Sequence, residues 1–256
     1  MTKIQEFNDL HTSEELLFLG NAWDLLSALT LEKVGFKAIG TTSWGIANSL
    51  GYIDGELIDF DRHLSIIKTI AENVNIPVSA DIEAGYSENV EIVINNVLKT
   101  ADIGVVGINI EDSLKKQKGL REISKHCNLL EKIRIALDTN GFKNFYINAR
   151  TDTYFQRENP LLETIDRAKS YVESGASGIF VPGMKLEEDI REVALKIKAP
   201  LNVLSLLGLT NCNKLKELGV KRFSFGNALS DKYITFLEKN TEQLIECKDT
   251  AHLYID

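Results

Sequence analysis

The sequence is poor in proline and cysteine and has no long apolar run. Its four prolines and 17 glycines form no Pro/Gly-rich linker, so nothing in the 256 residues marks a domain boundary. No stretch approaches the ~18 consecutive apolar residues that a transmembrane helix needs. The three cysteines, Cys127, Cys212 and Cys247, are far apart and form no CxxC pair, which is typical of free thiols in a reducing compartment.

An excess of positive charge is also absent. The chain has 29 Lys and Arg against 37 Asp and Glu, a net charge of −8, and no long basic run. This balance argues against partners such as nucleic acids and anionic membrane surfaces. Residues 1–8 carry acid and amide groups where the apolar part of a signal peptide would lie. We therefore expect a cytoplasmic protein.

What the sequence does contain is a repeated pair, a short apolar strand followed by a helical pattern. The predicted strands are 16–23, 38–43, 77–83, 105–111, 145–150, 178–183, 201–205 and 222–226. The predicted helices are 25–35, 63–75, 90–101, 129–139, 162–174, 187–198, 213–218 and 229–246. Eight alternations predict an α/β protein, a single (β/α)8 TIM-type barrel of residues 1–256. A doubly wound open sheet is the alternative, weakened because no GxGxxG follows a strand.

The third predicted strand ends in two carboxylates, Asp81 and Glu83, followed by glycine. Alternation along a strand would place both on the same side. If that side faces a pocket, two anionic oxygen ligands lie together and suit a hard cation such as Mg²⁺. The alternative is a strand-to-helix loop whose acids cap the next helix. This stretch alone does not separate the two.

In a barrel, the active site lies at the C-terminal ends of the strands. Asp81 and Glu83 end strand three, Glu111 ends strand four and Arg150 ends strand five. Carboxylates could hold a dication there while Arg150 pairs with a carboxylate or phosphonate of the substrate. Alternatively, Arg150 neutralises the acids in a structural cluster. Further polar residues at these ends are Asn21, Asp24, Thr41, Thr42, Ser43, Trp44, Asn109, Asp112, Asn148, Asp152, Ser205 and Asn227.

Several other chemistries lack their residues. The four histidines fall at no strand end, which disfavours a zinc site or a His-based triad. No lysine ends a strand, so a Schiff-base aldolase is disfavoured. No serine lies in a GxSxG context.

Six stretches resemble the isocitrate lyase/phosphoenolpyruvate mutase superfamily, in its order and at its spacing, over nearly the whole chain. They are Asn21–Ala28, Gly40–Trp44 with Leu50–Asp54, Asp81–Tyr86, Asn109–Asp112 and Ile147–Asp152. The chain is most similar to the short bacterial branch described as carboxyvinyl-carboxyphosphonate phosphorylmutase-like. The resemblance implies a barrel whose last helix is exchanged with a neighbour, in a homo-oligomer that is a dimer or tetramer.

The resemblance also implies a divalent metal ion, Mg²⁺ or Mn²⁺. Asp81 matches the metal-binding aspartate of the superfamily. Glu83 and Glu111 match residues that hold the water molecules of the ion.

A substrate site is implied in the same way. Thr42, Ser43 and Trp44 match a loop that binds the substrate carboxylate. Asp54 matches a loop acid near the reacting centre, and Arg150 matches the arginine that binds the far end of the substrate. The expected partner is a small keto acid.

The sequence departs from the superfamily pattern after Glu111. Residues 112–122 lack the Cys and His of the isocitrate and methylisocitrate lyases, so we expect neither activity. The corresponding loop pattern of the mutases and phosphonopyruvate hydrolases is missing too, and Pro182 stands where mutase-like enzymes have His. Lys115, Lys116 and Lys118 of this loop could close on an anionic substrate or, as we expect, form a solvated charged loop.

These features together predict a Mg²⁺-dependent lyase. It would cleave a carbon–carbon bond of a 2-keto or 2-hydroxy dicarboxylate through an enolate, as in the decarboxylation of oxaloacetate. The alternatives are a phosphonomutase or phosphonopyruvate hydrolase that acts on a P–C bond, a barrel that binds a keto acid without catalysis, and an unrelated metal aldolase.

Overall fold

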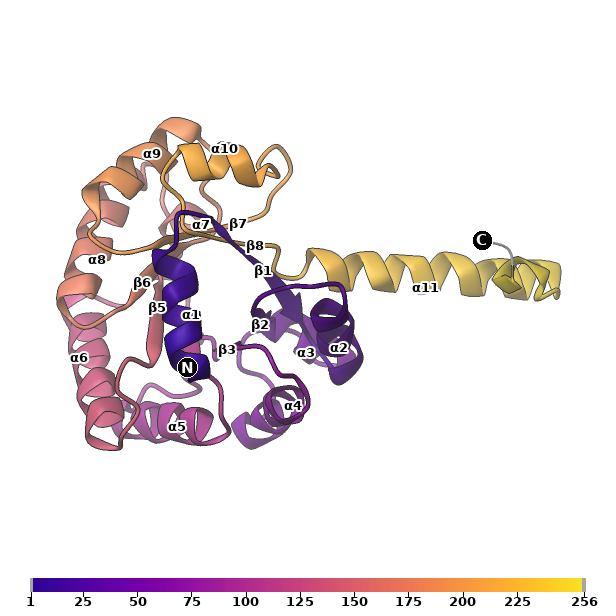
Figure 1. The fold of residues 1–256 in the computed structure, drawn as a ribbon, viewed down its shortest axis with the longest axis horizontal. Coiled ribbons are helices and arrows are strands. Elements are labelled where there is room, and N and C mark those ends of the chain that lie inside the picture. Colours follow the sequence, from indigo (N-terminus) through magenta and orange to yellow (C-terminus); the bar gives the residue numbers. More distant parts are fainter. Residues whose placement is uncertain (1, 255–256) are drawn as a thin grey trace.

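A closed barrel of parallel strands forms the centre of the molecule. The structure is a computed structural model that describes residues 2–254. In these residues eight strands pair in chain order, and β8 pairs with β1 (Figure 1). They are β1 (Leu17–Ala22), β2 (Ile39–Thr41), β3 (Val78–Asp81), β4 (Gly107–Glu111), β5 (Tyr146–Arg150), β6 (Gly178–Val181), β7 (Leu201–Leu204) and β8 (Arg222–Ser224). The predicted barrel is confirmed, and the open sheet is wrong.

Helices follow the strands where the helical patterns predict them. They are α2 (Leu25–Lys33), α4 (Phe60–Asn73), α5 (Val90–Asp102), α6 (Ile123–Thr139), α8 (Leu161–Glu173), α9 (Glu187–Lys196), α10 (Cys212–Glu217) and α11 (Ala228–Cys247). Helix α4 is typical: its Asp59 cap accepts hydrogen bonds from two backbone N–H groups of the first turn. Phe60, His63, Ile67 and Ile70 recur every three or four residues and form its buried face.

Four helical segments were not predicted. They are α1 (Lys3–Thr12), α3 (Ser43–Ser49), α7 (Thr153–Gln156) and the 3-10 turn η1 (Ala251–Tyr254). Helix α1 closes the N-terminal opening of the barrel, because Phe7 packs in one cluster with residues at the starts of several strands, among them Leu17, Val106 and Tyr146. The opposite opening, at the C-terminal ends of the strands, is therefore the accessible one.

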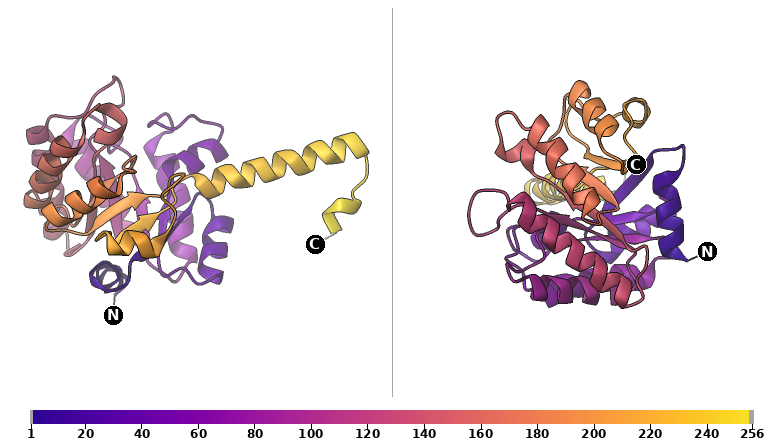
Figure 2. Two further views of the ribbon diagram at one scale, coloured as in Figure 1. Left: turned by 90° about the horizontal axis from the view of Figure 1, so that it is seen from above. Right: turned by 90° about the vertical axis from the view of Figure 1, so that its left-hand side faces the viewer.

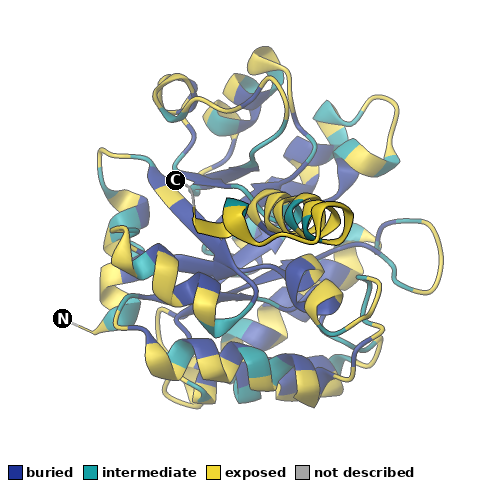
Figure 3. Cartoon of the chain, turned by 90° about the vertical axis from the view of Figure 1, so that its right-hand side faces the viewer, coloured by how far each residue is buried: buried dark blue, intermediate teal, exposed yellow. Residues whose placement is uncertain are grey.

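Helix α11 contacts its own barrel only through its first turns, where the Tyr233 ring lies 5.9 Å from that of Trp23, and the rest of it projects outward (Figures 1 and 2). Along most of its length it is exposed (Figure 3), and Tyr233, Phe236 and Leu237 are large apolar side chains that face solvent. Next to its base, Phe18 of β1 is 42% exposed and lies against the rings of Phe36 and Phe223. The outside of β1 and β8 thus lacks the helix that would cover it in a complete barrel.

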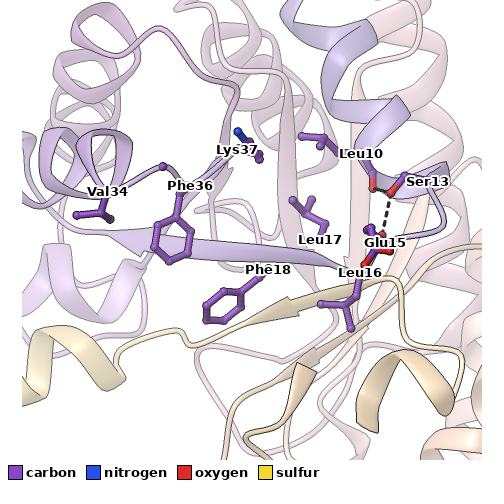
Figure 4. Close-up of a pocket in the computed structure, with 10 residues that line it drawn as sticks. Leu10, Ser13, Glu15, Leu16, Leu17, Phe18, Val34, Phe36 and Lys37 are labelled. Atoms are coloured by element: carbon purple, nitrogen blue, oxygen red, sulfur yellow. Dashed lines mark hydrogen bonds between the residues drawn. The ribbon is translucent and has the colours of Figure 1, made fainter. Parts of the chain in front are cut away.

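The hollow in Figure 4 belongs to this uncovered wall. It lies outside the barrel between α1, β1 and the segment after α2, and its lining includes Leu10, Leu16, Phe18 and Phe36. Its mostly apolar lining suits packing rather than chemistry on a charged substrate. Between residues 2 and 254, no helix has the length and hydropathy to cross a membrane.

Candidate active site at the C-terminal mouth of the barrel

A cavity of about 330 Å³ opens at the C-terminal ends of the strands. Six of the eight predicted site residues line it: Thr42, Ser43, Trp44, Asp54, Asp81 and Arg150. The other two, Glu83 and Glu111, are buried beside the cavity and are absent from its lining. The structure therefore brings together residues that are up to 108 positions apart in the sequence (42 to 150), as the barrel prediction requires.

The predicted carboxylate-binding loop is the junction of β2 and α3. The Thr42 hydroxyl caps α3 by accepting from the Gly45 N–H at 3.4 Å. Gly45 is required there, because a Cβ at this position would lie 2.7 Å from the Cβ of Trp23. The Ser43 hydroxyl then donates to Asp81 Oδ2 at 3.4 Å, so the loop and the acid face the same space.

Trp44 has a second contact besides the cavity. Its indole Nε1–H donates to Asp231 Oδ1 at 3.0 Å, and Asp231 lies in the first turn of α11. The rim of the cavity is therefore joined to the projecting helix.

Strand alternation does not explain where Glu83 lies. β3 ends at Asp81, and Glu83 has a φ of +51°, in the left-handed region. Its backbone N–H donates to Asp81 Oδ1 at 3.2 Å, and its Oε1 accepts from the Tyr86 hydroxyl and the Glu56 N–H, each at 3.1 Å. The expectation that Asp81 and Glu83 share one side of a strand is wrong, and a tight turn places them next to each other instead.

Lys115 lies between the two buried glutamates. Its Nζ is 2.8 Å from Glu83 Oε2 and 2.6 Å from Glu111 Oε1, and its side chain is only 19% exposed. Burial lowers the pKa of Lys115, but pairing with Glu111 and Glu83 outweighs this and holds the pKa above its usual value. The expectation of a solvated loop is therefore wrong for Lys115, whereas Lys116 and Lys118 are exposed.

Arg150 is held by two carboxylates. Its Nη1 is 3.0 Å from Glu111 Oε2 and its Nε is 2.6 Å from Asp152 Oδ1, while the guanidinium lies over the ring of Phe180. Arg150 thus neutralises neighbouring acids, as expected for a structural cluster, and it also lines the cavity, as expected for a substrate-binding residue. The two interpretations of this residue are compatible.

The mouth carries surplus negative charge. Asp54, Asp81, Glu83, Glu111 and Asp152 face two cations, Lys115 and Arg150. Burial, followed by the charges of Glu83 and Asp81, raises the pKa of Asp54 to about 6. Burial likewise raises the pKa of Glu111, and Arg150 and Lys115 partly offset this. Among the described residues Asp54 Oδ1 is buried and has no hydrogen-bond partner. Such a site attracts a cation.

The residues fit a Mg²⁺ ion that keeps most of its water. In residues 2–254 no group of three or more His, Cys, Asp or Glu side chains converges as a metal cage. Mg²⁺ commonly binds one or two carboxylates and several waters, and Asp81 with the unpartnered oxygen of Asp54 can supply these. The predicted ligands Asp81, Glu83 and Glu111 could act on one ion together only if Lys115 no longer contacted Glu83 and Glu111.

Some residues of the cavity had no role assigned from the sequence. Phe155 and Phe180 form apolar walls, and Asn109 and Asn21 contribute amides. Phe155 lies on the unpredicted α7, so the sequence held no signal for it. Asn109 lies near the C-terminal end of β4, and this position in the sequence pattern could have indicated a role in the site.

Known proteins show what this chain is similar to. The family model described as phosphoenolpyruvate phosphomutase matches residues 7–245. The uncharacterised Mycobacterium tuberculosis protein Rv1998c is 36% identical over 226 residues, which span 86% of this chain and 81% of that protein. The 2,3-dimethylmalate lyase of Eubacterium barkeri is 28% identical over 199 residues, 75% of this chain and 68% of the lyase.

Among solved structures, phosphonopyruvate hydrolase in complex with oxalate and Mg²⁺ superposes with a TM-score of 0.88. It is 21% identical, covers 98% of this chain and 90% of its own, and shows the common fold. The family match and the relatives agree with the barrel fold. The chain therefore belongs to the phosphoenolpyruvate phosphomutase family of the isocitrate lyase/phosphoenolpyruvate mutase superfamily.

Proposed function

We propose that the protein is a Mg²⁺-dependent lyase that cleaves a carbon–carbon bond of a small 2-keto or 2-hydroxy dicarboxylate. The observation that carries the proposal is one cavity of about 330 Å³ lined by Asp81, Asp54 and Arg150. Oxygen ligands for a cation and a guanidinium for a carboxylate line the same small space. The superfamily includes lyases such as the dimethylmalate lyase relative, which supports this reaction class.

The metal site would be held by Asp81, with Asp54 beside it; Mn²⁺ could take the place of Mg²⁺. When bound, such an ion polarises a keto oxygen and stabilises the negative charge of an enolate. Arg150 pairs with a carboxylate of the substrate, and its bonds to Glu111 and Asp152 fix the direction of the guanidinium. Thr42 can donate its hydroxyl proton to the other carboxylate, and Ser43 can do so once its 3.4 Å contact with Asp81 Oδ2 is released.

Asp54 is suited to proton transfer. In the metal-free protein its pKa is about 6, close to neutral, where a side chain can both accept and release a proton. Loss of CO₂ requires no protein acid at the carbon that is cleaved. A decarboxylation therefore tolerates the lack of Cys and His in residues 112–122, whereas the isocitrate and methylisocitrate lyase reactions, as the resemblance describes them, do not.

A second candidate is a keto-acid-binding barrel without catalysis. Lys115 forms ion pairs with Glu83 and Glu111, and Arg150 forms ion pairs with two carboxylates. This candidate is favoured because these charged groups are already paired in the absence of a ligand. A phosphonomutase or phosphonopyruvate hydrolase activity is a third candidate. For this one, Pro182 in the cavity wall is unfavourable, since mutase-like enzymes have His at this position.

We further propose that two copies exchange α11. The apolar face of this helix is exposed, and the uncovered wall near Phe18 lacks a helix in the described chain. Exchange would cover both surfaces at once and give a homo-oligomer, a dimer or tetramer. The three cysteines are free, which suits the reducing cytoplasm.

A substrate panel with and without EDTA tests the function. It comprises oxaloacetate, methylisocitrate, phosphonopyruvate and dimethylmalate, with wild type, Asp81→Ala and the control Asp102→Ala, an exposed acid at the end of α5. We expect metal-dependent release of pyruvate from oxaloacetate by wild type and Asp102→Ala but not by Asp81→Ala. Turnover that is equal with and without metal would refute the proposal.

The other outcomes identify the competing candidates. Turnover of phosphonopyruvate alone would establish the P–C reaction, and cleavage of methylisocitrate would show that the loop chemistry is not required. Thermal stabilisation by oxalate that depends on Mg²⁺, without product from any acid, would identify a binding protein.

A further inference from the structure

Four polar side chains form a connected network in the barrel interior, directly below the cavity. Asn109 lies on β4, Asn148 on β5, Asn202 on β7 and Arg222 on β8. All four are buried, and of these only Asn109 also lines the cavity. Asn109 pairs in register with Asp81 of β3, so it is a direct neighbour of the proposed metal-binding acid.

The backbone fixes the orientation of these amides. Asn202 Nδ2 lies 3.0 Å from the Val203 carbonyl oxygen and 3.2 Å from that of Arg222. A carbonyl oxygen only accepts, so the Asn202 atom there must be the NH₂ group, and its Oδ1 must face Asn148. Asn148 Nδ2 therefore donates to Asn202 Oδ1 at 3.1 Å and to Asn109 Oδ1 at 2.8 Å.

Arg222 fixes the orientation of the Asn109 amide independently of Asn148. Its Nη2 donates to Asn109 Oδ1 at 3.3 Å, and a guanidinium can only donate. The side-chain oxygen of Asn109 thus accepts hydrogen bonds from both Asn148 and Arg222 inside the barrel. What Asn109 presents to the cavity is its Nδ2–H₂ group, and the described part of the chain gives this nitrogen no acceptor.

Structural contacts compensate the charge of Arg222 only weakly: besides Asn109, its guanidinium lies over the ring of Phe7, with Cζ 5.9 Å from the ring centre. Arg222 is 1% exposed, and in residues 2–254 its Nε and Nη1 have no hydrogen-bond partner and its guanidinium no carboxylate at ion-pair distance. Burial lowers the pKa of Arg222 to about 10, so the group remains a cation at neutral pH. An unpaired buried charge opposes folding, and an apolar side chain of similar size would serve the core better.

We propose that Asn109 binds the substrate through its Nδ2–H, which donates to an oxygen at the cavity floor, and that Arg222 is the positioning residue that holds this amide. The inference rests on the proposed function in that it takes the ligand to be a keto acid. A neutral donor is useful beside Asp81 and Asp54, because it can stabilise a substrate oxygen that gains negative charge without pairing with the acids.

The test is calorimetric binding of oxalate in the presence of Mg²⁺, together with melting curves, for wild type and four variants. Arg222→Met removes the buried charge and the hold on Asn109. We expect its Tm to be unchanged or raised and its Kd for oxalate to be at least about tenfold weaker, the effect of losing a hydrogen bond to a charged group. A purely structural role would lower Tm and leave Kd unchanged, which would overturn the proposal.

Two variants of Asn109 separate the donor from charge. Asn109→Asp keeps an oxygen toward Arg222 but replaces the cavity-facing N–H, so binding should weaken at least about tenfold without loss of Tm. Asn109→Ala removes the donor without adding charge and should weaken binding equally. Asn140→Asp, on the exposed end of α6, is the control for an added charge and should bind as wild type does.

Wild-type affinity of Asn109→Ala would show that charge alone matters and would overturn the inference. If wild type binds oxalate and all variants bind equally, the inference fails and the proposed function stands. If wild type does not bind oxalate with Mg²⁺, both fail.

Discussion

Replacing Lys115 by methionine should destabilise the metal-free protein and sharpen its response to Mg²⁺. The methionine side chain is of similar length but lacks the ammonium that contacts Glu83 and Glu111 at 2.8 and 2.6 Å. Both glutamate side chains are only 4% exposed, so the variant leaves two buried carboxylates close together. Arg150 still contacts Glu111, whereas Glu83 loses its only ion-pair partner among the described residues.

The magnitude follows from burial. Breaking a buried ion pair costs about 3–5 kcal/mol, and we take about 2–3 kcal/mol because Lys115 is 19% exposed and retains some solvent. In a chain of this length, 1 kcal/mol corresponds to roughly 2–4 °C in Tm. The variant should therefore melt roughly 5–10 °C below wild type in EDTA.

The matched control is Lys116→Met in the same loop. Lys116 is 81% exposed and 3.9 Å from Glu88, so its loss should change the free energy of unfolding by less than about 0.5 kcal/mol.

Differential scanning calorimetry in EDTA and in a Mg²⁺ series measures both effects. A dication that no longer competes with the ammonium should bind the variant more tightly, and each tenfold gain in affinity adds about 1.4 kcal/mol of stabilisation at saturation. The stabilisation by Mg²⁺ should thus be larger for Lys115→Met than for wild type. A variant as stable as wild type in EDTA, or a smaller response to Mg²⁺, would refute the reasoning.

Three further predictions concern the same site and the projecting helix. In EDTA, Asp54→Asn should be more stable than wild type by roughly 1–2 kcal/mol at pH 8 and should lose this advantage below pH 4. The pKa of Asp54 is about 6 in the folded protein and 3.8 in the unfolded chain, so the wild type loses stability as the pH rises through this range. Equal Tm values of variant and wild type from pH 3.5 to 8 would contradict this. Arg150→Met should weaken oxalate binding at least about tenfold by calorimetry, and unchanged affinity would leave Arg150 as a structural cation. Phe236→Asp on α11 should convert the oligomer to monomer in light scattering, whereas Lys239→Asp should not; a monomeric wild type would exclude helix exchange.

The barrel could be predicted because its strands are buried on both faces. Runs such as 105–111 and 145–150 read as continuous apolar segments, and their C-terminal ends meet wherever a parallel sheet closes. That rule alone placed Asp81 and Arg150 at one cavity. It also indicated Asn109, whose amide direction, however, depends on three other strands and has no sequence signature.

The rest of the site depends on contacts that no local pattern encodes. The turn at Glu83 uses a left-handed conformation at a residue that is not glycine, held by bonds from Glu56 and Tyr86. Lys115 reads as one of several loop lysines, and only the fold brings it between two acids 4 and 32 residues away. Helix α1 buries just Phe7 and His11, too few positions for a periodic signal.

The indole bond between Trp44 and Asp231 couples the rim of the cavity to a helix that extends about 30 Å from its first residue. A contact that fixes the far end of α11 therefore also fixes the positions of Asp231 and Trp44. In an assembly with exchanged helices, the neighbour would do this, and dilution would release it. Specific activity should then decrease as the protein is diluted.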